Sequence, residues 1–252
     1  MKASLLLVLM IGLFLSCSRT IDDTNQNCTS NCTIIRGRIF TRDNKPVSNV
    51  NVALSYKKNT VTYSYVKRKI KNVRSDQNGY YEIDFYMNDG EVGAAGNGYF
   101  TIDIDKNSFD SNHYLIPGNP LFAISSQIYS ISKRDTTITK DYYMPTKSSL
   151  KIHLKDFKPI KPEDAFQVKV LYPYGWRTNV INDYLGGYFE TGIAGEIGEY
   201  SATSNDYTTT IGVASNDTCV IRIAKIKNGI SFPEETRIFI LDNSLLEFTY
   251  HY

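Results

Sequence analysis

Short segments in which apolar and polar residues alternate recur along most of this chain, and turn residues separate them. In 80–85 the apolar positions are 81, 83 and 85, and in 150–154 they are 150, 152 and 154. A period of two residues is typical of a strand with one buried face. No long stretch follows the period of a helix, so the pattern predicts an all-β fold.

The predicted strands form two groups that meet near 145–147. The first group lies at 33–41, 47–56, 80–85, 99–105, 121–132 and 135–144. The second group lies at 150–154, 166–172, 207–214, 218–226, 237–241 and 245–250. The spacing predicts two consecutive β-sandwich domains, at 33–146 and 147–252. The composition agrees with a β fold, because the chain contains 19 Tyr and 12 Phe, and both residue types favour strands.

The chain opens with a leader at 1–16 that is basic at Lys2 and then apolar for too few residues to cross a bilayer. Its end, Phe-Leu-Ser-Cys at 14–17, resembles the lipobox of bacterial lipoproteins, in the looser form found in Bacteroidota. The resemblance implies cleavage before Cys17 and acyl chains such as palmitate on it, at the cell outer membrane. Residues 17–32 are then expected to be a flexible tether. An ordinary secretory signal with an incidental Cys17 is the alternative.

Three further cysteines follow. Cys28 and Cys32 are close enough in sequence to form a small disulfide in an oxidising compartment. A zinc site would need four ligands, and no second Cys or His cluster accompanies this pair. Cys219 lies within a strand pattern and is expected to be a buried thiol.

The text IIRGRIFTRDNKPVSNVNVAL, followed by RSDQNGYYEIDF, carries a family resemblance. It resembles the carboxypeptidase regulatory-like domain, a transthyretin-like β-sandwich that is usually an accessory module. The residues that match are Gly37, Pro46, Val47, Val50, Val52, Asp76, Gly79 and Tyr81. Pro46 and Gly79 are expected in turns, with a positive φ at Gly79. The resemblance is good over 33–90 and poor from there to 146.

The chain departs from that family at 57–74, which is expected to form an extra hairpin with seven basic residues. Two interpretations stay open for it: a patch for acidic polysaccharide or nucleic acid, or a solvated edge whose lysines discourage aggregation. The second is favoured. The net charge is only +2 for the whole chain and +1 (27 basic minus 26 acidic) without the leader, so no global field attracts nucleic acid. No nucleic-acid partner is expected.

The motifs of common enzymes are absent from the sequence. His113, His153 and His251 are isolated, and no GxSxG motif occurs. The acidic stretch at 103–110 departs from a calcium loop at Ser108 and again at Tyr114, although an irregular calcium site formed by its four polar residues stays open. Those residues are Asp103, Asp105, Asn107 and Asp110. No cofactor, no metal and no enzymatic activity are expected; two carboxylates converging in a cleft would be needed for a hydrolase.

One aromatic stretch and one short motif complete the candidate sites. Tyr172, Tyr174, Trp176 and Arg177 lie in an expected turn, where exposed rings beside an Arg suit stacking on sugars. The alternative is that Trp176 covers one end of a sandwich core. Asp-Thr-Thr at 135–137 resembles the O-glycosylation motif of Bacteroidota envelope proteins, which makes Thr136 a candidate acceptor.

Together these observations predict a lipid-anchored envelope protein at the outer membrane. Its expected role is a non-catalytic scaffold or accessory that binds a partner protein. The alternative is a surface glycan-binding lipoprotein that captures polysaccharide with the aromatic residues of the second domain.

Overall fold

The computed structural model describes residues 19–59, 65–93, 98–116, 124–177, 191–241 and 245–252. These residues are almost entirely strands, with short 3-10 turns at Asp89–Glu91 and Lys106–Ser108. The predicted all-β fold is confirmed. No helix among the described residues is long and apolar enough to cross a membrane.

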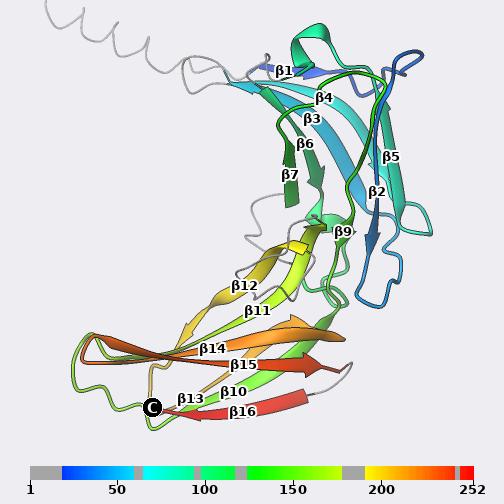
Figure 1. Cartoon of the computed structure of the whole chain (residues 1–252). Coiled ribbons are helices and arrows are strands. Elements are labelled where there is room, and N and C mark those ends of the chain that lie inside the picture. Colours follow the sequence, from blue (N-terminus) through cyan, green and yellow to red (C-terminus); the bar gives the residue numbers. More distant parts are fainter. Residues whose placement is uncertain (1–18, 60–64, 94–97, 117–123, 178–190, 242–244) are drawn as a thin grey trace, which may run out of the picture.

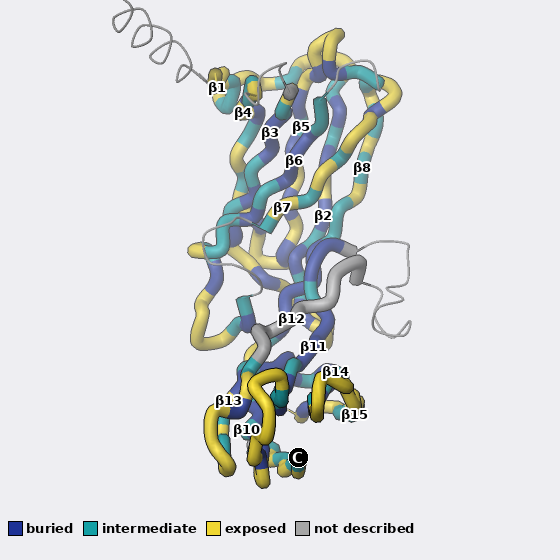
Figure 2. The backbone as a smooth tube through the Cα atoms, turned by 90° about the vertical axis from the view of Figure 1, so that its left-hand side faces the viewer, coloured by how far each residue is buried: buried dark blue, intermediate teal, exposed yellow. Residues whose placement is uncertain are grey.

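The first sandwich is built from nine strands of the described chain (Figure 1). They are β1 (Arg19–Asp22), β2 (Thr33–Phe40), β3 (Asn51–Asn59), β4 (Tyr65–Arg74), β5 (Tyr80–Phe85), β6 (Gly98–Ile104), β7 (Ile124–Ile128), β8 (Thr137–Thr139) and β9 (Tyr142–Tyr143). One sheet has the order β1-β4-β3-β6-β7, and β2, β5, β8 and β9 form the opposite layer. Alternating residues such as Leu54, Ile83 and Ile102 fill the space between the layers. Figure 2 shows this buried interior along β3, β5 and β6.

The second sandwich contains seven strands of the described chain. They are β10 (Lys147–Lys155), β11 (Ala165–Arg177), β12 (Thr191–Ser201), β13 (Asp206–Ala214), β14 (Asp217–Lys227), β15 (Ile230–Ile240) and β16 (Leu245–His251). A three-stranded sheet, β13-β10-β16, faces the layer of β15, β14, β11 and β12. The alternation at 150–154 places Leu150, Ile152 and Leu154 in this core with no exposed surface.

The two sandwiches share one sheet. Its order is β15-β14-β11-β9-β2-β5, so it begins in the second sandwich and ends in the first. The link is the two-residue strand β9, which pairs in parallel with β2 and antiparallel with the end of β11. β10 begins at Lys147, where the sequence placed the domain boundary, but β11 later returns across that boundary. The two sandwiches are therefore joined through hydrogen-bonded backbone as well as through the chain.

Several local expectations can be compared with the structure. Gly79 has a φ of 77°, as its place in a turn requires. The insert at 57–74 contributes the whole of β4, which pairs antiparallel with β3. Gly37 is needed for close approach, because a Cβ there would lie 1.9 Å from the Lys140 carbonyl oxygen.

The expectation of a flexible tether at 17–32 is wrong for the part that the structure describes. β1 pairs in parallel with β4 from Arg19↔Val66 to Asp22↔Lys69, and so extends the five-stranded sheet at its edge. Unpaired backbone groups on β4 provide the hydrogen bonds that hold this short, exposed strand. β1 lies at one end of the molecule and the C-terminus at the opposite end (Figures 1 and 2).

Candidate functional site

The aromatic stretch is not the exposed platform that the glycan hypothesis requires. Tyr172 is 2% exposed and Trp176 is 4% exposed, and both lie in β11 and not in a turn. The side chain of Arg177 lies outside the described residues. The physical reason is that β11 runs from one core to the other: Tyr172 packs in the second core, Tyr174 against its margin, and Trp176 in the first. Burial contradicts glycan stacking by Tyr172 and Trp176, and Trp176 lies in a core as the alternative had it.

Trp176 packs edge-on against Tyr142, with ring centroids 5.2 Å apart. The Tyr142 hydroxyl and the Trp176 indole nitrogen are buried and find no hydrogen-bond partner among the described residues. Both rings therefore stabilise this junction through buried apolar surface and through their contact with each other. Their buried polar atoms, in contrast, carry a desolvation cost.

A buried polar contact ties the two sandwiches together next to these rings. The Tyr143 hydroxyl, at the end of the first sandwich, donates to Asp217 Oδ2 at 2.5 Å, and Asp217 begins β14 in the second. Asp217 is 1% exposed; its other oxygen accepts from the Thr218 backbone N–H at 2.8 Å and lies 3.9 Å from Arg42 Nε. Burial raises the pKa of the Asp217 carboxyl, and burial together with that carboxylate raises the pKa of Tyr143.

Backbone hydrogen bonds and one apolar side chain reinforce the junction. The N–H of Ser215 donates to the Thr146 carbonyl at 2.8 Å, and the N–H of Lys147 donates to the His113 carbonyl at 2.9 Å. Leu115 comes from a loop of the first sandwich but belongs to the hydrophobic cluster of the second. Contacts of three kinds therefore limit movement between the two bodies.

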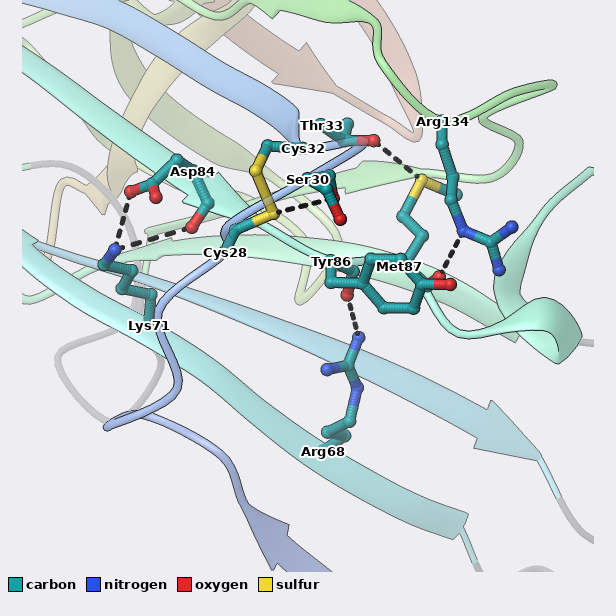
Figure 3. The surroundings of a disulfide bond; sticks show 10 residues. All are labelled: Cys28, Ser30, Cys32, Thr33, Arg68, Lys71, Asp84, Tyr86, Met87 and Arg134. Carbon is teal, nitrogen blue, oxygen red and sulfur yellow. Dashed lines mark hydrogen bonds and ion pairs between the residues drawn. A yellow bond between two sulfur atoms is a disulfide. The ribbon is translucent and has the colours of Figure 1, made fainter.

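A second cluster fixes the N-terminal segment to the first sandwich. Cys28 and Cys32 form a disulfide, with their Cα atoms 5.7 Å apart (Figure 3). The bond closes the loop between β1 and β2. It therefore holds the segment that follows β1 in a compact turn beside β5 and β4.

Arg68 is the centre of this cluster, and it is only 7% exposed although it lies in the basic insert. Its Nε donates to Glu91 Oε1 at 2.8 Å and its Nη2 to Glu91 Oε2 at 2.5 Å, which gives a bidentate pair. Its Nη1 lies 3.4 Å from an oxygen of Asp23. Its Nη2 also donates to the Tyr86 carbonyl at 3.3 Å (Figure 3). One buried guanidinium thus links the N-terminal segment, β4 and the turn at Glu91.

The remaining candidates do not form a metal centre in the described residues. No group of three or more His, Cys, Asp or Glu side chains there is placed to hold a metal ion. In the acidic stretch, Asp105 accepts from the Asn107 N–H and begins the 3-10 turn, which is the Asx-turn interpretation. Asp103 accepts from Ser125, and Asp110 accepts from the Asn112 N–H.

The isolated histidines have local partners. His153 lies between Thr208, at 2.9 Å, and Glu247, at 3.2 Å, on the outer face of the three-stranded sheet. His251 contacts Asp156 at 2.5 Å. Cys219 is buried, as expected, and burial raises the pKa of its thiol to about 12, which disfavours the thiolate form that a nucleophile needs.

An open groove of about 800 Å³ lies on the first sandwich. Two arginines, Arg36 and Arg74, line it together with three acidic residues, Asp76, Glu82 and Asp141. The groove therefore favours neither an anionic nor a cationic ligand. Thr136, the candidate glycosylation site, directly precedes β8 and is half-buried; its carbonyl accepts from the Ile34 N–H. Modification of Thr136 stays a prediction. Cys17 lies outside the described residues, and so its acylation also stays a prediction.

Sequence reasoning missed the residues that hold the junction and the N-terminal segment: Tyr143, Asp217, Arg68 and Glu91. The one available signal was Arg68, because it occupies an inward position between the apolar Val66 and Ile70 of β4. A cation at such a position requires a buried anion. Nothing in the sequence pointed to Tyr143 and Asp217, which are 74 residues apart.

The structure therefore defines an all-β protein of two joined sandwiches with a docked N-terminal segment. No family model matches the chain, and no curated protein matches it. Solved structures with remote similarity include the Bacillus anthracis TIE protein, with a TM-score of 0.29, 10% identity, 87% of this chain covered and 34% of that chain.

A streptococcal ancillary pilin has a TM-score of 0.30 and 11% identity, covering 89% of this chain and 63% of its own. The shaft pilin SpaA of Lactobacillus rhamnosus GG has a TM-score of 0.30 and 9% identity, covering 87% and 97%. The present chain thus spans only about a third of the first of these proteins and under two thirds of the second. Similarity at this level says nothing about what this chain binds. The resemblance of 33–90 to the carboxypeptidase regulatory-like domain stays a prediction.

Proposed function

We propose that this chain is a lipid-anchored envelope protein that acts as a non-catalytic strut and holds a partner protein at a set distance from the outer membrane. The observation that carries the proposal is the junction. One sheet runs through both sandwiches, and the buried Tyr143–Asp217 contact locks it. A body joined in this way transmits position from one end to the other, whereas two domains on a linker do not.

The docked N-terminal segment supports attachment at one end. Only one residue separates Cys17 from Arg19, where β1 begins, and an extended chain spans about 3.5 Å per residue. An acylated Cys17 would therefore hold the end of the first sandwich against the lipid surface. Several acyl chains on one cysteine give firm attachment, since each buried methylene contributes about 0.8 kcal/mol.

The second sandwich is then the part that faces away from the membrane and is available to a partner. The figures place the C-terminus at the end opposite β1. The alternative function, glycan capture by the aromatic stretch, loses its basis because Tyr172 and Trp176 are buried.

Membrane attachment is tested by fractionation of cells that express Cys17→Ala. The variant should move to the soluble fraction, whereas Cys219→Ala is a matched control that removes a different cysteine and should stay with the membranes. A Cys17→Ala protein that remains wholly in the membrane fraction would refute the anchoring step.

The strut is tested separately, on the body without its anchor. Spin labels at Tyr80 and at Ile160, both exposed and on different sandwiches, should give one narrow distance distribution. The double variant Tyr143→Phe/Asp217→Asn, which removes the charged contact at the junction, should broaden it. A broad distribution in the unaltered body would mean that the sandwiches move independently and would remove the basis for a strut.

A further inference from the structure

β15 is an edge strand with an unusual surface. It is first in the order of the eight-stranded sheet, and within the described part of the chain only β14 pairs with it. It is 11 residues long, and most of it is exposed on both faces. Four large apolar side chains on and beside it are more than half exposed: Ile230 (61%), Phe232 (51%), Phe239 (53%) and Leu241 (63%). Such a long edge with exposed apolar residues is a site where another strand can add.

The register shows which residues face the free edge. β14 and β15 are joined by the two-residue turn Asn228-Gly229, with φ values of 53° and 76°, and Lys227 pairs with Ile230. In a hairpin of this kind the flanking pair is hydrogen-bonded, and hydrogen-bonded pairs then alternate along the ladder. Even-numbered residues of β15 therefore bond to β14, and odd-numbered residues direct their backbone groups outward. Pro233 is odd-numbered, so its missing N–H costs the existing sheet nothing, but it offers no donor to a strand that adds at the free edge.

The side chains along this edge are complementary to those of a second, antiparallel copy of the same strand. Glu235 and Arg237 flank Thr236 symmetrically. If a second β15 lies antiparallel with Thr236 opposite Thr236, each Glu235 faces Arg237 of the second copy. Within one chain Glu235 already bridges Arg222 at 2.9 Å and Arg237 at 3.0 Å, so the new pairs extend an existing network.

The same register covers the exposed rings. It places Phe239 opposite Pro233 of the second copy on the outer face of the sheet. On the inner face it places Phe232 opposite Ile240, which is fully buried in its own core, and beside Ile238. The ring of Phe232 thus continues the hydrophobic core of the neighbouring sandwich. Registers centred on Glu235 or Arg237 oppose like charges and are disfavoured.

We propose that β15 is a homodimerisation edge, in which two copies of this chain pair antiparallel about a two-fold axis at Thr236. The occupant is a second copy because the charges and the apolar residues match under that symmetry, as an isologous interface requires. The pairing joins two eight-stranded sheets into one at the end of the molecule remote from β1. It involves neither the N-terminal segment nor the groove on the first sandwich, so it does not depend on the proposed membrane role.

The test uses the chain from residue 19 onward, which contains every described strand, in sedimentation velocity over a wide concentration range. The unaltered chain should shift from monomer to dimer as concentration rises. Glu235→Arg and Arg237→Glu should each weaken dimerisation by at least about tenfold. Each substitution places two like charges opposite one another, and the two-fold axis makes this repulsion occur twice in the dimer. Circular dichroism confirms that each variant is folded.

The decisive sample is an equimolar mixture of the two variants. One copy then carries two positive charges at 235 and 237 and the other carries two negative charges. Heterodimers should therefore form at concentrations at which each variant alone is monomeric. Glu82→Arg, a reversal on the strand at the opposite edge of the same sheet, is the matched control and should dimerise normally. A monomeric unaltered chain at every concentration, or a mixture that stays monomeric, would overturn the proposal and show that Pro233 and the charges protect the edge.

Discussion

Two adjacent tyrosines at the junction should respond in opposite ways to the same substitution. Tyr142 and Tyr143 are both buried in β9, with 0% and 4% of their surfaces exposed. The Tyr143 hydroxyl donates to Asp217 at 2.5 Å, whereas the Tyr142 hydroxyl has no partner among the described residues. Replacing either residue with Phe removes one oxygen and leaves the ring in place.

The expected magnitudes follow from these partners. A hydrogen bond to a charged group contributes about 1.5–3 kcal/mol, and its loss also leaves the buried Asp217 carboxylate with fewer donors. Tyr143→Phe should therefore lower the free energy of unfolding by about 2–3 kcal/mol. Tyr142→Phe removes a buried hydroxyl that pays a desolvation cost without a bond, so it should be neutral or stabilising by about 1 kcal/mol.

Urea unfolding followed by tryptophan fluorescence is the appropriate assay. Trp176 is the single tryptophan of the chain, and its ring lies 5.2 Å from that of Tyr142, so its emission reports on the junction directly. A double-mutant cycle of Tyr143→Phe with Asp217→Asn isolates the coupling between the two groups, expected at about 1.5–3 kcal/mol. Equal effects of the two Phe substitutions, or a coupling near zero, would show that the contact does not hold the junction.

Three further predictions concern groups whose burial or linkage is defined by the structure. Burial raises the pKa of Asp217, so the folded state opposes ionisation of this carboxyl. As the pH rises from about 4, the free energy of unfolding of the unaltered chain should therefore fall relative to that of Asp217→Asn. Below that pH the difference between the two should be constant, as measured by urea unfolding at a series of pH values. Glu91→Gln removes the bidentate anion of the buried Arg68 guanidinium and leaves only Asp23, at 3.4 Å. It should cost about 3–5 kcal/mol by thermal or urea unfolding, whereas an effect below about 1 kcal/mol would mean that the pair is solvated. The Cys28→Ser/Cys32→Ser variant opens a loop of about five residues and should lose only about 2 kcal/mol, measured against the oxidised chain; unfolding of the whole protein would contradict this.

The strands could be predicted from the sequence because their signal is local. In β10 and β5 the buried face takes every second residue, so the alternation at 150–154 and 80–85 is sufficient. The turn at Gly79 could also be predicted, since a positive φ favours glycine. These features depend on neighbours in sequence and need no knowledge of the tertiary fold.

The junction and the docked segment could not be predicted because their contacts are non-local. Asp23 and Arg68 are 45 residues apart, and Tyr143 and Asp217 are 74 residues apart. The segment 19–22 has no periodic pattern, and it becomes a strand only because β4 offers an unpaired edge. Local polarity indicated a tether, and tertiary pairing produced a strand.

The aromatic stretch shows why composition alone misleads at such a junction. A strand that leaves one core and enters another must be apolar on the same face over its whole length. In β11 the residues on that face are Tyr172, Tyr174 and Trp176, and they pass from the second cluster to the first. Large rings near the single tryptophan resemble a binding platform in sequence, but here they fill the space between two sandwiches. The same rings that suggested a glycan site are therefore part of what makes the two sandwiches one body.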